Sequence, residues 1–184
     1  DQPAWADALL DRICAIRVAQ AECLVAAGVD MISLNDDIGS QRGMIMGPAM
    51  WRRWIKPRLA QLIAAARQVN PGVIFRYHSD GNYEAVIPDL IQVGVSALVT
   101  VQQEAMEPRH IKERFGRDLV LEGTIGLQGP LAHGTPNDVD ALVRRQCQEL
   151  MSGGGWVASP GNGVTPDIPL ANLAALFAAL DRYG

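Results

Sequence analysis

Two polar residues that can do acid–base or metal chemistry follow an apolar segment of the chain. His78 and Asp80 come directly after the apolar run 73–77. In an extended segment, residues i and i+2 point to the same side, so these two side chains can share a ligand, a metal ion or a proton. The alternative is a histidine that only bridges two loops. The spacing to Asp80 favours a functional role.

Two adjacent carboxylates, Asp36 and Asp37, follow another apolar run at 31–34. Paired acids at such a position can bind a metal ion, accept a proton or hold a cation. One of them can instead cap the following turn, which contains Gly39. The sequence does not tell which of the two faces a pocket. Arg42, in the same loop, either clamps a substrate carboxylate or phosphate or pairs with one of these acids.

Three further polar residues fall near the ends of later apolar runs. Glu122 interrupts an apolar run, and a buried glutamate needs a partner, so it is either an active-site acid or part of an ion pair beneath the site. Gln103 lies on the same expected rim. Asn162 can donate to a substrate or simply suit a tight turn. The candidate catalytic residues are therefore His78, Asp80, Asp37 and Glu122, and the candidate substrate-binding residues are Asp36, Arg42, Gln103 and Asn162.

The elements that must position these residues alternate regularly. Apolar runs predict strands at 31–34, 73–77, 97–101, 119–121 and 156–159, and helical spacing predicts helices at 5–27, 48–69, 83–93, 108–115, 135–151 and 170–181. This alternation favours parallel strands joined by right-handed crossovers. No Gly-x-Gly-x-x-Gly fingerprint follows the first strand, which disfavours a dinucleotide-binding fold.

The polar residues all follow strands, as the catalytic residues of a (β/α)₈ barrel do. A complete barrel has eight strands and typically about 250 residues, whereas this chain has 184 residues and five predicted strands. Five strands cannot close, and an open edge exposes unpaired backbone groups. We therefore expect a single α/β domain over residues 1–184, made of about five βα units, with about three units missing before it.

Composition narrows the function classes. The net charge is −4 with no basic run, which speaks against a nucleic-acid partner. No apolar run reaches the length of about 18–20 residues that a membrane span needs. Three scattered cysteines, Cys14, Cys23 and Cys147, do not form a disulfide framework and are expected to be buried thiols in a reducing cytoplasm.

Several motifs resemble the uroporphyrinogen decarboxylase superfamily over almost the whole chain and in the same order. They are 35–43 (Asn-Asp-Asp-Ile-Gly-Ser-Gln-Arg-Gly), 54–59 (Trp-Ile-Lys-Pro-Arg-Leu), 77–82 (Tyr-His-Ser-Asp-Gly-Asn), Phe115-Gly116, the helix start 134–136 (Gly-Thr-Pro) and 159–167 (Ser-Pro-Gly-Asn-Gly-Val-Thr-Pro-Asp). The resemblance implies a TIM barrel. It also implies that the strand at 156–159 is the eighth, so that the chain holds strands four to eight, the C-terminal part.

The superfamily that the chain resembles has two main branches, decarboxylases of uroporphyrinogen and methyltransferases that work with corrinoid proteins. The methyltransferases often hold zinc through a His-x-Cys pair and a later cysteine in a Pro-Gly-Cys-Gly turn. This chain keeps the histidine as His78 but has Asp80 and Asn162 at the cysteine positions. These are harder donors than thiolates, so a zinc-thiolate role is not expected, although His78 and Asp80 remain candidate ligands for a divalent metal such as zinc.

The two turns at 36–39 and 78–82 are more similar to the methyltransferase branch, and the late Gly-His-Gly turn of the decarboxylases reads Gly161-Asn162-Gly163 here. The expected function is methyl transfer from a small methylated substrate, with a corrinoid protein as partner and a homodimer as a further expectation. The alternatives are decarboxylation of a tetrapyrrole, which calls for arginines clustered at the mouth, and a non-catalytic or degenerate fragment that binds a partner.

Overall fold

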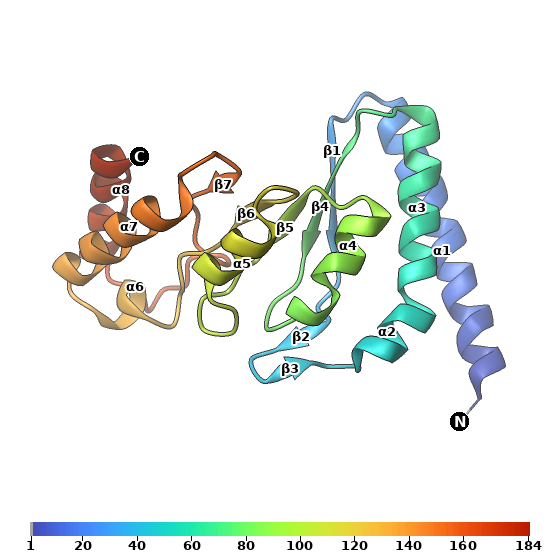
Figure 1. Ribbon diagram of the computed structural model, residues 1–184, viewed down its shortest axis with the longest axis horizontal. Coiled ribbons are helices and arrows are strands. Elements are labelled where there is room, and N and C mark those ends of the chain that lie inside the picture. Colours follow the sequence, from blue (N-terminus) through green and yellow to red (C-terminus); the bar gives the residue numbers. More distant parts are fainter. Residues whose placement is uncertain (1) are drawn as a thin grey trace.

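The central feature of the fold is a parallel sheet whose strands pair in the order in which they occur along the chain (Figure 1). The computed structural model describes residues 2–184. The sheet consists of β1 (Met31–Asn35), β4 (Ile74–His78), β5 (Ala97–Val99), β6 (Val120–Glu122) and β7 (Trp156–Val157), and every neighbouring pair is parallel. Because each crossover moves to the next strand in the same direction, right-handed connections place the helices on one face. The predicted α/β class and its five parallel strands are confirmed.

The helices follow the prediction with one break and one addition, α6 (Pro130–His133). They are α1 (Pro3–Ala26), α2 (Pro48–Trp54), α3 (Lys56–Val69), α4 (Ile87–Val93), preceded by the 3₁₀ turn η1 (Glu84–Val86), α5 (Pro108–Phe115), α6, α7 (Pro136–Leu150) and α8 (Leu170–Tyr183). The single helix expected at 48–69 breaks at Ile55, because Pro57 has no N–H to donate to the Arg53 carbonyl and its ring crowds that carbonyl. In residues 2–184 no helix combines the length and the apolar character that crossing a membrane requires.

The two faces of the sheet differ in what covers them. In β4, Phe75 and Tyr77 are buried against the helices, while Ile74, Arg76 and His78 alternate onto the opposite face. Apolar side chains on that opposite face are open: Met31 is 49% exposed, its register partner Ile74 45%, and Val157 46%. We call it the inner face. Within residues 2–184 this face is open at β1, β4 and β7, whereas the side chains of β5 are buried.

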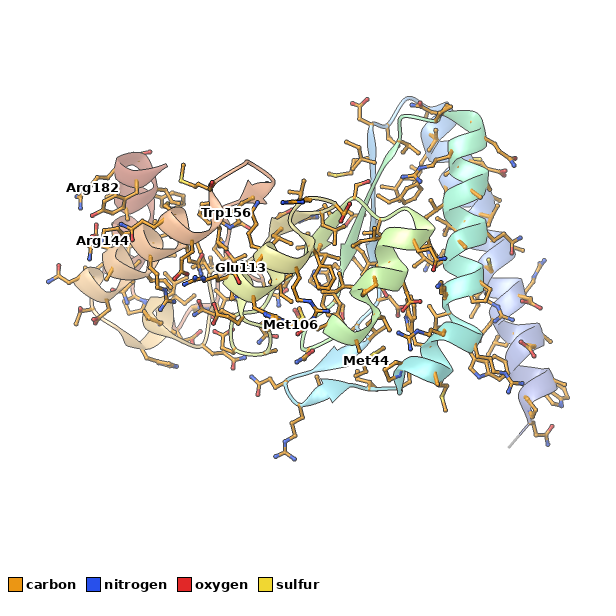
Figure 2. All side chains as sticks on the ribbon, viewed as in Figure 1. Met44, Met106, Glu113, Arg144, Trp156 and Arg182 are labelled. Carbon is orange, nitrogen blue, oxygen red and sulfur yellow. The ribbon has the colours of Figure 1, made fainter. Side chains whose placement is uncertain are left out.

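The buried core consists of two clusters joined by one side chain. The first cluster extends from Ala21 to Leu121 and lies between the sheet and the helices from α1 to α5. The second extends from Ile125 to Ala179 and lies among α6, α7 and α8. Trp156 of β7, labelled in Figure 2, packs against both. The apolar layer is therefore continuous through Trp156. The helices that contribute to it change from α1–α5 to α6–α8 after β6.

A short hairpin that the sequence did not predict follows β1. It consists of β2 (Gly39–Ser40) and β3 (Gly43–Met44) and lies against the turn after β4. The Asn82 N–H donates to the Ser40 carbonyl at 2.8 Å. A Cβ atom on Gly39 would lie 2.5 Å from the Asp80 carbonyl oxygen, and one on Gly81, whose φ is 74°, would lie 2.5 Å from the Gly39 carbonyl carbon. Two backbones touch here, and only glycine permits this approach.

Replacing Gly39 by alanine tests this contact. We expect Gly39→Ala to lower the free energy of unfolding by about 1–3 kcal/mol, the usual cost of overpacking, because the new methyl group meets backbone atoms that cannot rotate away. Gly163→Ala is the matched control, since a Cβ at Gly163 has nothing within 4 Å. Urea unfolding of both variants measures the difference. Equal stability of the two variants would contradict the contact.

Candidate active site

Three of the predicted residues come together at the carboxyl ends of β1 and β4. The His78 Nε2 atom lies 3.8 Å from Asp37 Oδ1 and 4.0 Å from Asp80 Oδ1. One ligand atom of each residue lies within 4.8 Å of the others. His78 ends β4, Asp80 follows it, and Asp37 arrives from the loop after β1. The arrangement is a cluster of one imidazole and two carboxylates, which can hold a cation or exchange protons.

Backbone hydrogen bonds fix Asp37 to the turn that carries Asp80. The Asp80 N–H donates to Asp37 Oδ1 at 3.0 Å. The buried Ser79 hydroxyl accepts from the Ile38 N–H at 3.0 Å and donates to the Asp80 carbonyl at 2.9 Å. Sequence reasoning missed Ser79. Its small hydroxyl between His78 and Asp80 was a signal, because serine readily bonds to local backbone groups in turns.

Asn162 completes the cluster from the loop after β7. Its Nδ2 atom donates to both oxygens of Asp80, at 2.8 Å and 3.1 Å. A carboxylate that accepts two amide hydrogen bonds is held in one orientation. Asn162 was predicted to bind substrate, and its amide nitrogen is engaged by Asp80.

Asp36 turns away from this cluster. Its Oδ2 atom accepts a hydrogen bond of 3.5 Å from the Tyr77 hydroxyl. It lines a groove of about 570 Å³ between α1, β1 and α3. Burial raises the pKa of the Asp36 carboxyl, and the charge of Asp37 acts in the same direction, while the Tyr77 hydrogen bond opposes them. The question that the sequence left open is thereby answered: Asp37, and not Asp36, faces His78.

Glu122 forms an ion pair on the inner face. Arg76 donates to it twice, from Nε to Oε2 at 2.8 Å and from Nη2 to Oε1 at 2.6 Å. Arg76 Nη1 also lies 3.4 Å from the Ser33 hydroxyl. This bidentate geometry satisfies both charges. Of the two roles expected for Glu122, the geometry matches the ion pair, and the group of metal-ligating atoms around His78 does not include it.

Gln103 and Arg42 lie apart from His78. The side-chain Oε1 atom of Gln103 accepts from Gln146 of α7 at 3.2 Å, and Gln146 also donates to the Thr124 backbone carbonyl at 2.8 Å. Gln103 thus belongs to a hydrogen-bonded network between the strand ends and α7. Arg42 lies exposed at the turn between β2 and β3. Within residues 2–184 no ion pair joins it to Asp36 or Asp37, so one of its two expected roles is not observed.

The donors in the cluster decide which metal fits. Zinc held by thiolates does not fit, because Cys14 and Cys23 lie on α1 and Cys147 on α7. Burial raises the pKa of the Cys14 and Cys147 thiols, whereas Cys23 is exposed, contrary to expectation. Two carboxylates and one imidazole are instead suited to divalent ions that accept oxygen and nitrogen ligands.

Both methyltransferases and uroporphyrinogen decarboxylases are similar to the chain. A methyltransferase structure from Methanosarcina mazei aligns with a TM-score of 0.74 and 26% identity over 96% of this chain and 49% of that one. The methylcobamide:CoM methyltransferase MtaA of Methanosarcina barkeri is 28% identical over 90% of this chain and 45% of its own length. The uroporphyrinogen decarboxylase of Coxiella burnetii is 23% identical over 99% of this chain and 48% of its own.

The chain spans about half the length of the curated relatives that it matches. The family profile described as uroporphyrinogen decarboxylase (URO-D) matches residues 1–183. The expected resemblance is thereby confirmed, and the parallel sheet, the order of its strands and the polar cluster at its carboxyl edge agree with it. The chain belongs to the uroporphyrinogen decarboxylase family.

Proposed function

We propose that the protein is a methyltransferase that takes a methyl group from a small methylated substrate and works with a corrinoid-carrying partner protein. The observation that carries this proposal is the convergence of Asp37, His78 and Asp80 at the carboxyl ends of parallel strands, where barrel enzymes keep their active sites. Relatives named as methylcobamide:CoM methyltransferases over 90% or more of this chain support it.

The residues have separate roles in this proposal. When the methyl group leaves, the electron pair of the broken bond stays on the leaving heteroatom of the substrate, which then takes a proton. The corrinoid supplies the cobalt that accepts the methyl group. His78 Nε2 passes the proton to the leaving heteroatom, Asp37 and Asp80 orient the imidazole from either side, and Asn162 holds Asp80.

Substitution of His78 tests the role of the imidazole. We expect His78→Ala to lower kcat/KM by about 10²–10⁴-fold, the usual contribution of general acid–base catalysis. Transfer from a panel of methylated alcohols, ethers and amines to reduced cobalamin can be followed by the absorbance of the cobalt. His110→Gln is the matched control, because His110 lies on α5 and pairs with Glu84 at 3.0 Å. Unchanged activity of His78→Ala would remove this role.

We further propose that the chain is the C-terminal part of a (β/α)₈ barrel, strands four to eight, and that about three further βα units complete it. Three observations support the proposal: within residues 2–184 β1 pairs on one side only, the inner face exposes the apolar side chains of Met31, Ile74 and Val157, and the chain spans about half of its relatives. A strand added beside β1 would satisfy its free backbone groups.

The open inner face makes a measurable prediction for the 184-residue chain. We expect the chain to bind anilinonaphthalene sulfonate, an apolar dye, and Ile74→Lys to reduce the dye fluorescence by placing a charge on this face. Phe177→Lys is the control, because Phe177 is 66% exposed on α8, away from the inner face. Equal loss of fluorescence in both variants, or no dye binding by the parent chain, would contradict the proposal.

Decarboxylation of a tetrapyrrole remains the second candidate, because the Coxiella decarboxylase matches 99% of the chain. A substrate with several carboxylates needs several free guanidinium groups. Here Arg76 is engaged by Glu122, and Arg42 lies at an exposed turn. The described residues therefore favour methyl transfer over decarboxylation. Tight binding of uroporphyrinogen with no methyl transfer would reverse this order, and absence of both activities would favour the non-catalytic alternative.

The ion pair between Arg76 and Glu122 is expected to stabilise the fold. In a cycle of Arg76→Met, Glu122→Gln and the double variant, urea unfolding should give a coupling energy of about 0.5–3 kcal/mol, because either single change leaves a half-buried charge without its partner. A coupling energy near zero, together with lost methyl transfer in Glu122→Gln alone, would return Glu122 to the catalytic residues.

A further inference from the structure

We propose that Asp37, His78 and Asp80 bind one divalent cation of the Mn²⁺ or Co²⁺ class, and that the substrate meets this ion through an oxygen atom and not through a thiol. The ion-binding part stands on the geometry of the cluster alone. The substrate part rests on the proposed function, because it assumes that this cluster is the active site. With the ion bound, His78 would be a ligand, and the ion in place of the imidazole proton would stabilise the electron pair on the leaving heteroatom.

The spacing of the three donors fits a single ion. Ligands at about 2.0–2.1 Å from a six-coordinate ion lie about 3.0 Å apart when adjacent and about 4.2 Å apart when opposite. His78 Nε2 lies 3.8 Å and 4.0 Å from the two carboxylate oxygens, and all three ligand atoms fall within 4.8 Å. Small rotations of three side chains therefore complete the coordination.

The backbone around the donors is already fixed. Asp37 and Asp80 belong to two loops that meet at the contact between Gly39 and Gly81. The Asp80 N–H bond to Asp37 and the two hydrogen bonds of Ser79 hold these loops in register. Because the loops are ordered by contacts of their own, an ion that binds there has little backbone to order.

The charge and the chemical type of the donors select the ion. Two carboxylates balance the charge of a dication, while the imidazole of His78 supplies a nitrogen ligand. Oxygen donors favour hard ions, imidazole favours transition metals, and a set of both favours the ions between these classes. Among residues 2–184 the thiols of Cys14, Cys23 and Cys147 lie outside the cluster, so thiophilic ions gain nothing here.

Asn162 acts as a positioning residue for Asp80. Its amide donates to both carboxylate oxygens from a loop 82 residues away in sequence. Partners of this kind orient a metal ligand, and their loss typically lowers metal affinity about 10–100-fold. The remaining positions of the ion are left to water or substrate, and an ion held by oxygen and nitrogen prefers an oxygen ligand there, such as a hydroxyl, ether or carboxylate.

Calorimetric titration of the chain with Mn²⁺, Co²⁺, Zn²⁺ and Cd²⁺ tests the site. We expect one equivalent of Mn²⁺ or Co²⁺ to bind, and Asp37→Asn and His78→Gln to weaken binding by at least about 10-fold. Asp36→Asn is the matched control, since Asp36 carries the adjacent carboxylate and faces Tyr77. Circular dichroism checks that each variant is folded. No uptake of Mn²⁺ or Co²⁺, or equal weakening by Asp36→Asn and Asp37→Asn, would overturn the proposal.

The spectrum of bound Co²⁺ distinguishes oxygen from sulfur ligands. We expect the parent chain to lack sulfur-to-cobalt charge-transfer absorption, and the double variant Asp80→Cys/Asn162→Cys to gain it together with a preference for Cd²⁺ over Mn²⁺. Acetate should perturb the Co²⁺ spectrum of the parent chain, and 2-mercaptoethanol should not introduce a sulfur band. A sulfur band with 2-mercaptoethanol would overturn the choice of an oxygen ligand.

The two proposals fail separately. Metal binding with these ligands but no methyl transfer would leave the ion site in place and remove the proposed function. Methyl transfer that survives the loss of metal binding in Asp37→Asn would leave the proposed function and remove this ion from the active site.

Discussion

The contact between the backbones of Gly39 and Gly81 is the constraint on which the site depends. It brings the loop after β1 against the turn after β4, although the two segments are about 40 residues apart in sequence. Strand pairing alone aligns Asn35 with His78 and leaves the direction of the following loops free. The hairpin β2–β3 and the two glycines turn the first loop back across the second, so that Asp37 meets His78 and Asp80.

The same geometry separates two carboxylates that are neighbours in sequence. Asp37 accepts from the Asp80 N–H in the exposed cluster, whereas Asp36 is directed towards Tyr77, where burial raises its pKa. Adjacent residues at the end of a strand point to opposite sides. One acid therefore serves the polar cluster and the other the groove beside α1. A pair that reads as a single acidic motif is divided between two environments.

Much of the fold followed from the alternation of apolar runs and helical spacing, because burial of strands and helices imposes those periods locally. The five parallel strands were predictable in this way. The hairpin β2–β3 was not, because two-residue strands have too few residues to show a period. Asp37, His78 and Asp80 could be named from their positions at strand ends. The partners of Glu122 and Asn162 could not, because they lie 46 and 82 residues away and depend on how the strands pack.

The division of the core into two apolar clusters has a consequence for cooperativity. Segments with their own buried clusters can open as separate units, each with its own free energy. The unit built on the first cluster carries Asp37, His78 and Asp80. The unit built on the second carries Asn162, and the Trp156 side chain packs against both. An opening of the second unit alone removes the Asn162 amide from Asp80 and leaves Asp37, His78 and Asp80 in place. The polar cluster is therefore complete only while the second unit stays folded, although that unit contributes only the Asn162 side chain to it.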